Sequence, residues 1–107
     1  MATHLNGEGY KDPAAVIAGS VLEEHLRHLA GKHQIPILDA NNRFRKAEAI
    51  NQDLRANNIY NLLEQKNVTA WRDLRNNAAH GHYNNYDAQQ VHSLIDNVRN
   101  FIARHPA

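Results

Sequence analysis

The stretch DAQQVHSLIDNVRNFIARHP, residues 87–106, is the part of the chain that most clearly decides the fold. Asp87 and Gln90 have the separation of a capping box, which marks the start of a helix. Apolar side chains then recur at intervals of three and four residues, at Val91, Leu94, Ile95, Val98 and Ile102. This spacing places them on one face of an α-helix. The pattern predicts an amphipathic helix that ends before Pro106.

Two earlier segments also have helical spacing. Asp12 followed by Pro13 is typical of a helix start, and Gly31 with Lys32 is typical of a helix end. Between them apolar residues repeat at helical intervals: Ile17, Ala18, Val21, Leu22, Leu26 and Leu29. We therefore expect a helix over residues 13–32. A shorter helix is expected up to the asparagine pair at 57 and 58, on a face made of Phe44, Ala47, Ile50 and Leu54.

The segment 59–80 carries apolar residues in two groups, Ile59, Leu62 and Leu63 and then Val68, Trp71, Leu74 and Ala78. The polar interval 64–67 between them predicts a kink or a break in this third helix. No stretch alternates with period two over the length of a strand. The expected fold is an all-α, four-helix, up-down bundle, or five helices if the third one breaks. We expect one domain over residues 13–105 after a flexible N-terminal segment, residues 1–12.

The composition excludes several classes of protein. The 107 residues include no cysteine, which rules out disulfides and thiolate zinc sites, and no run of about 20 apolar residues that could span a membrane. We expect a soluble, cytoplasmic protein with no membrane association. The net charge of +1 is far from that of a non-specific nucleic-acid coat, although residues 43–107 carry nine basic and six acidic side chains. This mild skew is compatible with an anionic ligand in the C-terminal half.

A second stretch, RNNAAHGHYNNY at residues 75–86, gathers the side chains that could carry chemistry. Asn76 and His80 are four residues apart and share a helix face, whereas Arg75 and His80 do not share one by spacing alone. Gly81 is suited to the left-handed conformation that ends a helix. A guanidinium can steady negative charge on a phosphorus centre, and an imidazole can move protons near neutral pH. Phosphodiester chemistry is therefore one interpretation of Arg75, Asn76 and His80.

Spacing alone does not single out this site, because Arg27 with His33 and Arg99 with His105 are similarly spaced. The wider segment VTAWRDLRNNAAHG, residues 68–81, resembles the signature helix of HEPN domains. In that family of small α-helical bundles, an arginine, usually followed by a polar residue, precedes a histidine with four to six residues between them. The helix AVIAGSVLEEHLRHLAGKH, residues 15–33, is similar to the opening helix of such domains.

The resemblance implies a HEPN-like, metal-independent endoribonuclease that works as a homodimer, without a cofactor, and cleaves RNA by attack of its 2′-hydroxyl. It implies that Arg75 stabilises the phosphate, that His80 is general acid or base and that Asn76 orients one of them. Many such proteins are toxins or antiviral defence effectors, so an antitoxin or another protein partner is a further expectation. One branch has a modifiable tyrosine two residues after the histidine; here that position is His82 and Tyr83 follows it.

Each of these interpretations has a non-catalytic or purely structural alternative. The rival function is a catalytically inactive HEPN-like module that binds a nucleotide, RNA or a protein. His82, Tyr83 and Tyr86 are weaker candidates for substrate contacts, and the two tyrosines could instead seal the end of the bundle. His25 and His28 lie one turn apart, but no third ligand is evident, so no metal site is predicted. Trp71 is expected in the core or at a dimer interface.

Overall fold

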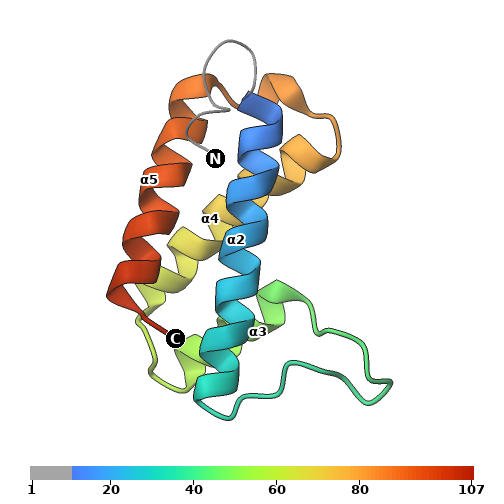
Figure 1. The fold of residues 1–107 in the computed structure, drawn as a ribbon, viewed down its shortest axis with the longest axis vertical. Helices are drawn as coiled ribbons and strands as arrows, with labels where there is room; N and C mark the ends of the chain where they lie inside the picture. The colour runs from blue at the N-terminus through green and yellow to red at the C-terminus, as the bar shows by residue number, and fades with distance from the viewer. Residues whose placement is uncertain (1–10) are drawn as a thin grey trace.

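The helices form where the sequence supplies an apolar face and a residue that can end or begin a turn. The computed structural model describes residues 11–107. Its helical elements are α2 (Lys11–Lys32), α3 (Ala47–Ala56), α4 (Leu62–Ala79), the 3-10 turn η1 (Tyr83–Asn85) and α5 (Ala88–Arg104) (Figure 1). The predicted fold class is confirmed, because the described chain is an all-α bundle of four helices.

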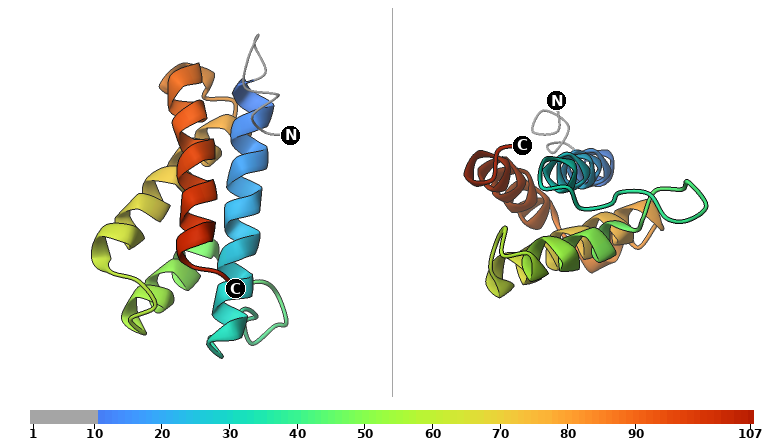
Figure 2. Two further views of the ribbon diagram at one scale, coloured as in Figure 1. Left: turned by 60° about the vertical axis from the view of Figure 1, so that its left-hand side comes forward. Right: turned by 90° about the horizontal axis from the view of Figure 1, so that it is seen from below.

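Helix α2 is the centre of the bundle, and its most extensive contacts are with α4 and α5. α2 and α5 lie side by side and run in the same direction, whereas α4 runs the opposite way and crosses α2 obliquely (Figures 1 and 2). The short α3 packs against α2 and α4. Within residues 11–107, no helix is both long enough and apolar enough to cross a membrane.

The core is built around Phe101 of α5, which is fully buried. The ring centroid of Phe101 lies 5.7 Å from that of Tyr60, 5.7 Å from that of Trp71 and 5.0 Å from that of His105. The Tyr60 and Trp71 rings meet Phe101 edge to face, an arrangement that aromatic quadrupoles favour. Trp71 is partly buried against the core, so the predicted core role of Trp71 is confirmed.

The predicted α5 is confirmed, including its cap. The Asp87 carboxylate accepts a hydrogen bond from the Gln90 backbone N–H at 2.7 Å, and the Gln90 side chain accepts one from the Asp87 N–H at 2.8 Å. These two bonds form the capping box. The buried face of α5 consists of Val91, Leu94, Ile95, Val98 and Phe101. Ile102 is only partly buried, because Phe101 occupies the central position.

The predicted break at 64–67 is wrong. α4 is continuous from Leu62 to Ala79, and Asn61 caps it by accepting a hydrogen bond from the Glu64 N–H at 2.9 Å. Glutamate, glutamine and lysine are good helix formers, so the polar interval interrupts the apolar face without interrupting the backbone. Ile59 and Tyr60 precede this helix rather than opening it.

Two predictions at helix starts are also wrong. Lys11 and Asp12 are already helical, so Asp12 does not cap α2; its carboxylate instead accepts a hydrogen bond from the Tyr86 hydroxyl. Residues 1–10 of the predicted flexible segment lie outside the described residues. Phe44 is not on the buried face of α3, because that helix starts at Ala47 and the Phe44 ring is 66% exposed. The predicted end of α3 is confirmed, with Asn58 at φ 60°.

Replacing Leu94 by alanine tests the buried face of α5. Leu94 is 1% exposed, so Leu94→Ala should lower the free energy of unfolding by roughly 2 to 5 kcal/mol, as truncation of a buried leucine does. Urea or thermal unfolding measures the change. Ser93→Ala, at the exposed neighbouring position, is the matched control and should shift the midpoint little. An unchanged midpoint for Leu94→Ala would contradict the packing.

Candidate functional site

The position of Arg75 is set by the close crossing of α4 over α2. Gly19 of α2 is buried directly against the aliphatic stem of Arg75. A Cβ atom placed on Gly19 would lie 2.1 Å from Cγ of Arg75 and 2.4 Å from its Cβ, which is far inside van der Waals contact. The absence of a side chain at Gly19 therefore allows the two helices to approach, and it fixes where the Arg75 stem runs.

The Arg75 guanidinium lies beside Asn76, and no carboxylate of residues 11–107 forms an ion pair with it. Its Nη1 donates to Oδ1 of Asn76 at 3.3 Å. Nε of Arg75 is the one buried side-chain nitrogen or oxygen among the described residues that has no hydrogen-bond partner. By contrast, the arginines at 45, 72 and 104 each form an ion pair with a carboxylate. Arg75 thus retains its positive charge without a described counterion, and an anion could supply one.

His80 ends α4 in the way the sequence predicts. It occupies the C-cap, and Gly81 follows at φ 78°. The Gly81 N–H donates to the Ala78 carbonyl at 3.4 Å, and the His82 N–H donates to the Asn77 carbonyl at 2.8 Å. This pair of bonds is a Schellman motif, which satisfies two carbonyls at the helix end. The His80 side chain is exposed, so it is accessible to a ligand in solution.

The predicted site residues are only partly brought together. Arg75 contacts Asn76, and the His80 and His82 rings face each other with centroids 6.4 Å apart. Among the described residues, no hydrogen bond, ion pair or ring contact joins Arg75 to His80. A single chain therefore presents the guanidinium and the imidazole as neighbouring but separate groups on the last turns of α4.

The two tyrosines have different environments. Tyr83 is 47% exposed and remains accessible. Tyr86 is 6% exposed, its hydroxyl donates to Asp12, and Nζ of Lys11 lies 4.4 Å from its ring centroid. Burial and the neighbouring Asp12 carboxylate raise the pKa of Tyr86. Tyr86 therefore closes the end of the bundle, as one of its two interpretations expected, and its ring offers little surface for stacking on a base.

The histidines considered as metal ligands have other partners. Nε2 of His25 lies 2.7 Å from the carbonyl oxygen of His105, and His28 lies 3.9 Å from Glu24 on the same helix. Within residues 11–107, no group of three or more histidine and carboxylate side chains is placed to hold a metal ion.

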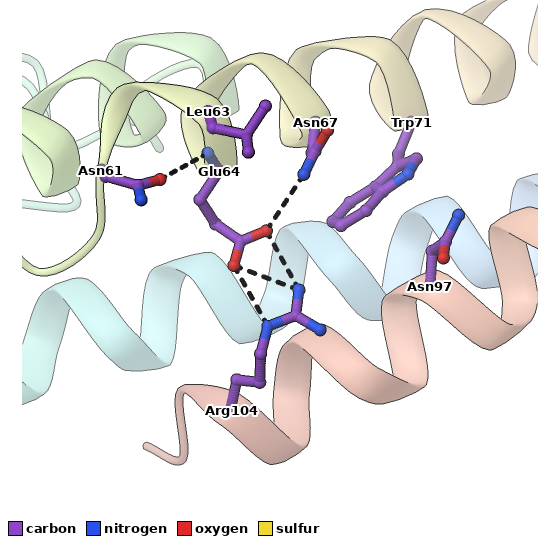
Figure 3. Close-up of a pocket in the computed structure, with 7 residues that line it drawn as sticks. All are labelled: Asn61, Leu63, Glu64, Asn67, Trp71, Asn97 and Arg104. Atoms are coloured by element: carbon purple, nitrogen blue, oxygen red, sulfur yellow. Dashed lines mark hydrogen bonds and ion pairs between the residues drawn. The ribbon is translucent and has the colours of Figure 1, made fainter.

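A cleft between α4 and α5 was not foreseen from the sequence. It has a volume of about 430 Å³ and is lined by Asn61, Leu63, Glu64, Asn67, Trp71, Asn97 and Arg104 (Figure 3). Burial by itself raises the pKa of Glu64, but hydrogen bonds from His105, Arg104 and Asn67 outweigh it and hold that pKa below its usual value. Glu64 lies in the polar interval that was interpreted as a helix break, so the sequence did not indicate its contacts with α5.

The charges in this cleft are already neutralised. The Glu64 carboxylate accepts two hydrogen bonds from Nη2 of Arg104, at 3.0 and 3.1 Å, and a third bond, from Nε, at 3.2 Å. Nε2 of His105 lies 3.1 Å from the same carboxylate. Glu64 therefore ties the end of α5 to the start of α4, and the cleft offers a ligand no unpaired charge.

Gly19→Ala tests the crossing that places Arg75. In an ordinary helix interior this change stabilises, but here the new Cβ would force the Arg75 stem and α4 away from α2. We expect a loss of about 1 to 3 kcal/mol in the free energy of unfolding, as overpacking costs. Gly31→Ala is the matched control, because no atom lies within 4 Å of a Cβ there. Equal midpoints for the two variants would contradict the close crossing.

Comparison of the chain with models of known protein families, with curated proteins and with solved structures finds no match.

Proposed function

We propose that this protein is a HEPN-like, metal-independent endoribonuclease in which Arg75, Asn76 and His80 form the active site. The observation that carries the proposal is the guanidinium of Arg75, which is held by Asn76 while no described carboxylate neutralises it and one buried N–H has no partner. An RNA phosphate would supply the missing charge and would accept hydrogen bonds from the Nη groups of the guanidinium. The exposed His80 at the end of the same helix is the proton-transfer group.

The reaction follows from the chemistry of these groups. His80 accepts the proton of an RNA 2′-hydroxyl as that oxygen forms a bond to the adjacent phosphorus. The bond from phosphorus to the 5′-oxygen breaks, and an acid returns a proton to the leaving oxygen. Arg75 steadies the negative charge on the phosphorus centre, and Asn76 holds the guanidinium. The products are a 2′,3′-cyclic phosphate and a free 5′-hydroxyl, and no metal takes part.

The active form in this proposal is a homodimer. Arg75 and His80 of one chain do not touch. A second copy that brings its own Arg75 and His80 beside them would complete the pair of acid and base. A partner surface is available on α2, because Val21, in the apolar stripe of that helix, is 46% exposed. Closed twofold dimers are the commonest symmetric assembly.

A role as a toxin or antiviral defence effector, with an antitoxin or another protein as partner, belongs to the same proposal. The role is supported by the resemblance of residues 68–81 to the HEPN signature helix. The partner is expected because an RNA-cleaving protein must be kept inactive until it is needed. His82 occupies the position of the modifiable tyrosine, so control by modification at that position does not apply to this chain. The exposed Tyr83 is the neighbouring tyrosine.

The catalytic proposal predicts the behaviour of three variants. His80→Ala should slow RNA cleavage by about 10² to 10⁴-fold with the fold intact, because His80 is exposed at a helix end. Arg75→Ala should be comparably damaging, and Arg75→Lys should rescue little, because an ammonium lacks the bidentate geometry of a guanidinium. Chelator should leave cleavage unchanged, and DNA should remain uncut. Product analysis should show the cyclic phosphate.

The controls are exposed residues of the same types. His92→Ala on α5 and Arg55→Ala on α3, prepared in the same way, should cleave RNA like the wild type. Equal cleavage by wild type, Arg75→Ala and His80→Ala would identify the activity as a contaminant and overturn the enzyme proposal. Loss of RNA binding in Arg75→Ala without any cleavage by the wild type would instead leave the inactive binding module.

The dimer is tested separately by mass. Light scattering at micromolar concentration should give about twice the 12.2 kDa of one chain. Val21→Asp should shift the protein toward the monomer, because it buries an unpaired charge in the interface, whereas Val21→Thr should not. A monomer mass for the wild type would reject the homodimer.

A further inference from the structure

The segment between α2 and α3 forms a projecting loop that the Arg75 site does not use. Residues 36–46, here named the Phe44 finger, extend away from the bundle in Figures 1 and 2. Leu38 and Phe44 pair across the finger as an antiparallel bridge. Both side chains are exposed, Leu38 by 43% and Phe44 by 66%. The finger therefore presents two apolar side chains to solvent at its bridge.

The Phe44 finger is held in one conformation by its own hydrogen bonds. Oδ1 of Asp39 accepts from the Asn41 N–H at 2.8 Å and from the Arg43 N–H at 3.1 Å. The Asp39 N–H donates to the Arg43 carbonyl at 2.8 Å, and the Arg45 N–H donates to the Ile37 carbonyl at 2.9 Å. The ring of Phe44 is therefore presented by an ordered turn, which reduces the entropy that a ligand must remove on binding.

The base of the finger is anchored to the bundle. The guanidinium of Arg45 donates to the Pro36 carbonyl and to the Asp53 carboxylate of α3, both at 2.7 Å. Ile35 is buried, and Ile37 packs against the core. The finger consequently keeps a fixed position relative to α2 and α3.

The charge on the finger is positive where it is exposed. Arg43 and Lys46 are exposed, and no described carboxylate forms an ion pair with either. Asp39, the one acidic residue in the finger, is occupied by the backbone N–H groups of the turn. From α2, the guanidinium carbon of Arg27 lies 5.1 Å from the Phe44 ring centroid. Arg27 thus lies against the aromatic ring, and Arg43 and Lys46 are its neighbours along the chain.

The finger and Arg75 lie along the same side of α2. Gly19, Glu23 and Arg27 follow one another at intervals of four residues, so they share one face of that helix. Their contacts across that face are Arg75, Arg72 and Phe44 respectively. Gly19 and Arg27 are separated by a rise of about 12 Å. A continuous strand could therefore reach both Arg75 and Phe44.

We propose that the Phe44 finger binds single-stranded RNA, with a base stacked on the Phe44 ring and phosphates held by Arg27, Arg43 and Lys46. The inference rests on the proposed function, because it extends the RNA path from the scissile phosphate at Arg75. Aromatic side chains stack on unpaired bases of any sequence, and cations follow the backbone. Phe44 and Leu38 alone make too small an apolar surface for a stable protein interface, whereas one exposed ring is sufficient to stack on one base.

Binding is measured by fluorescence anisotropy with a short labelled oligouridine, in the His80→Ala background so that the RNA stays intact. Phe44→Ala should weaken binding by about 5- to 150-fold, as loss of one stacked base does, and Phe44→Trp should restore it. Leu63→Ala, which also truncates an exposed apolar side chain, should bind normally. Arg43→Ala with Lys46→Ala should reduce the slope of log affinity against log salt by about 1.4.

The outcomes separate this inference from the proposed function. With the wild-type His80, Phe44→Ala should raise KM and leave kcat at saturating RNA unchanged, whereas Arg75→Ala lowers kcat. Equal RNA binding by the parent and Phe44→Ala, with loss in Arg75→Ala, would overturn the finger and leave the active site. Binding that depends on Phe44 without any cleavage would overturn the enzyme and leave the finger. Two other results would overturn the proposal that the Phe44 finger binds RNA: conversion of the dimer to a monomer by Phe44→Ala, or no RNA binding by the parent.

Discussion

The contact between Gly19 and the stem of Arg75 is the constraint on which the rest of the structure depends. It lets α4 cross directly over α2, because any side chain at Gly19 would occupy the space taken by Cβ and Cγ of Arg75. The same contact therefore sets both the packing of the two helices and the position of Arg75. Leaving Nε of Arg75 buried without a partner costs roughly 1 to 3 kcal/mol, which is part of the cost of this close crossing.

Polar contacts help to hold α4, in which Val68 and Ala78 are buried and Trp71 and Leu74 are partly buried against the core. The Arg72 guanidinium donates to Glu23 of α2 at 3.4 Å and to Glu48 of α3 at 3.2 Å, which links three helices. The fully buried Asn51 of α3 donates to the Gln65 carbonyl at 3.0 Å and accepts from the Tyr60 hydroxyl. Buried polar groups require specific partners, so this network fixes the register of α3 and α4 more sharply than apolar packing alone.

The pairing of charges in this chain of net charge +1 leaves several cations without a carboxylate partner among the described residues. Arg45, Arg72 and Arg104 are neutralised by carboxylates that they also help to position. The cations without a described carboxylate partner include Arg75 and the exposed Arg43 and Lys46. Ion pairs with arginine thus engage Glu23, Glu48, Asp53 and Glu64, while these three cations are not part of such a pair. The net charge of the chain is a poor guide to where such cations lie, because a ligand interacts with the local arrangement of charges.

The sequence by itself determined the features that depend on residues close together along the chain. The capping box of α5, the left-handed Gly81 after His80 and the all-α fold follow from spacing and local hydrogen bonds. Only the tertiary structure decided which side chains a neighbouring element covers. Tyr86 is buried and Phe44 is exposed, although both are aromatic residues in polar surroundings of the sequence. The sequence placed Arg75, Asn76 and His80 at the end of one helix, and the spacing already separated Arg75 from His80. The burial of the Arg75 stem depends on Gly19 of the opposing helix α2, because burial is set by contacts between segments that the order of residues does not reveal.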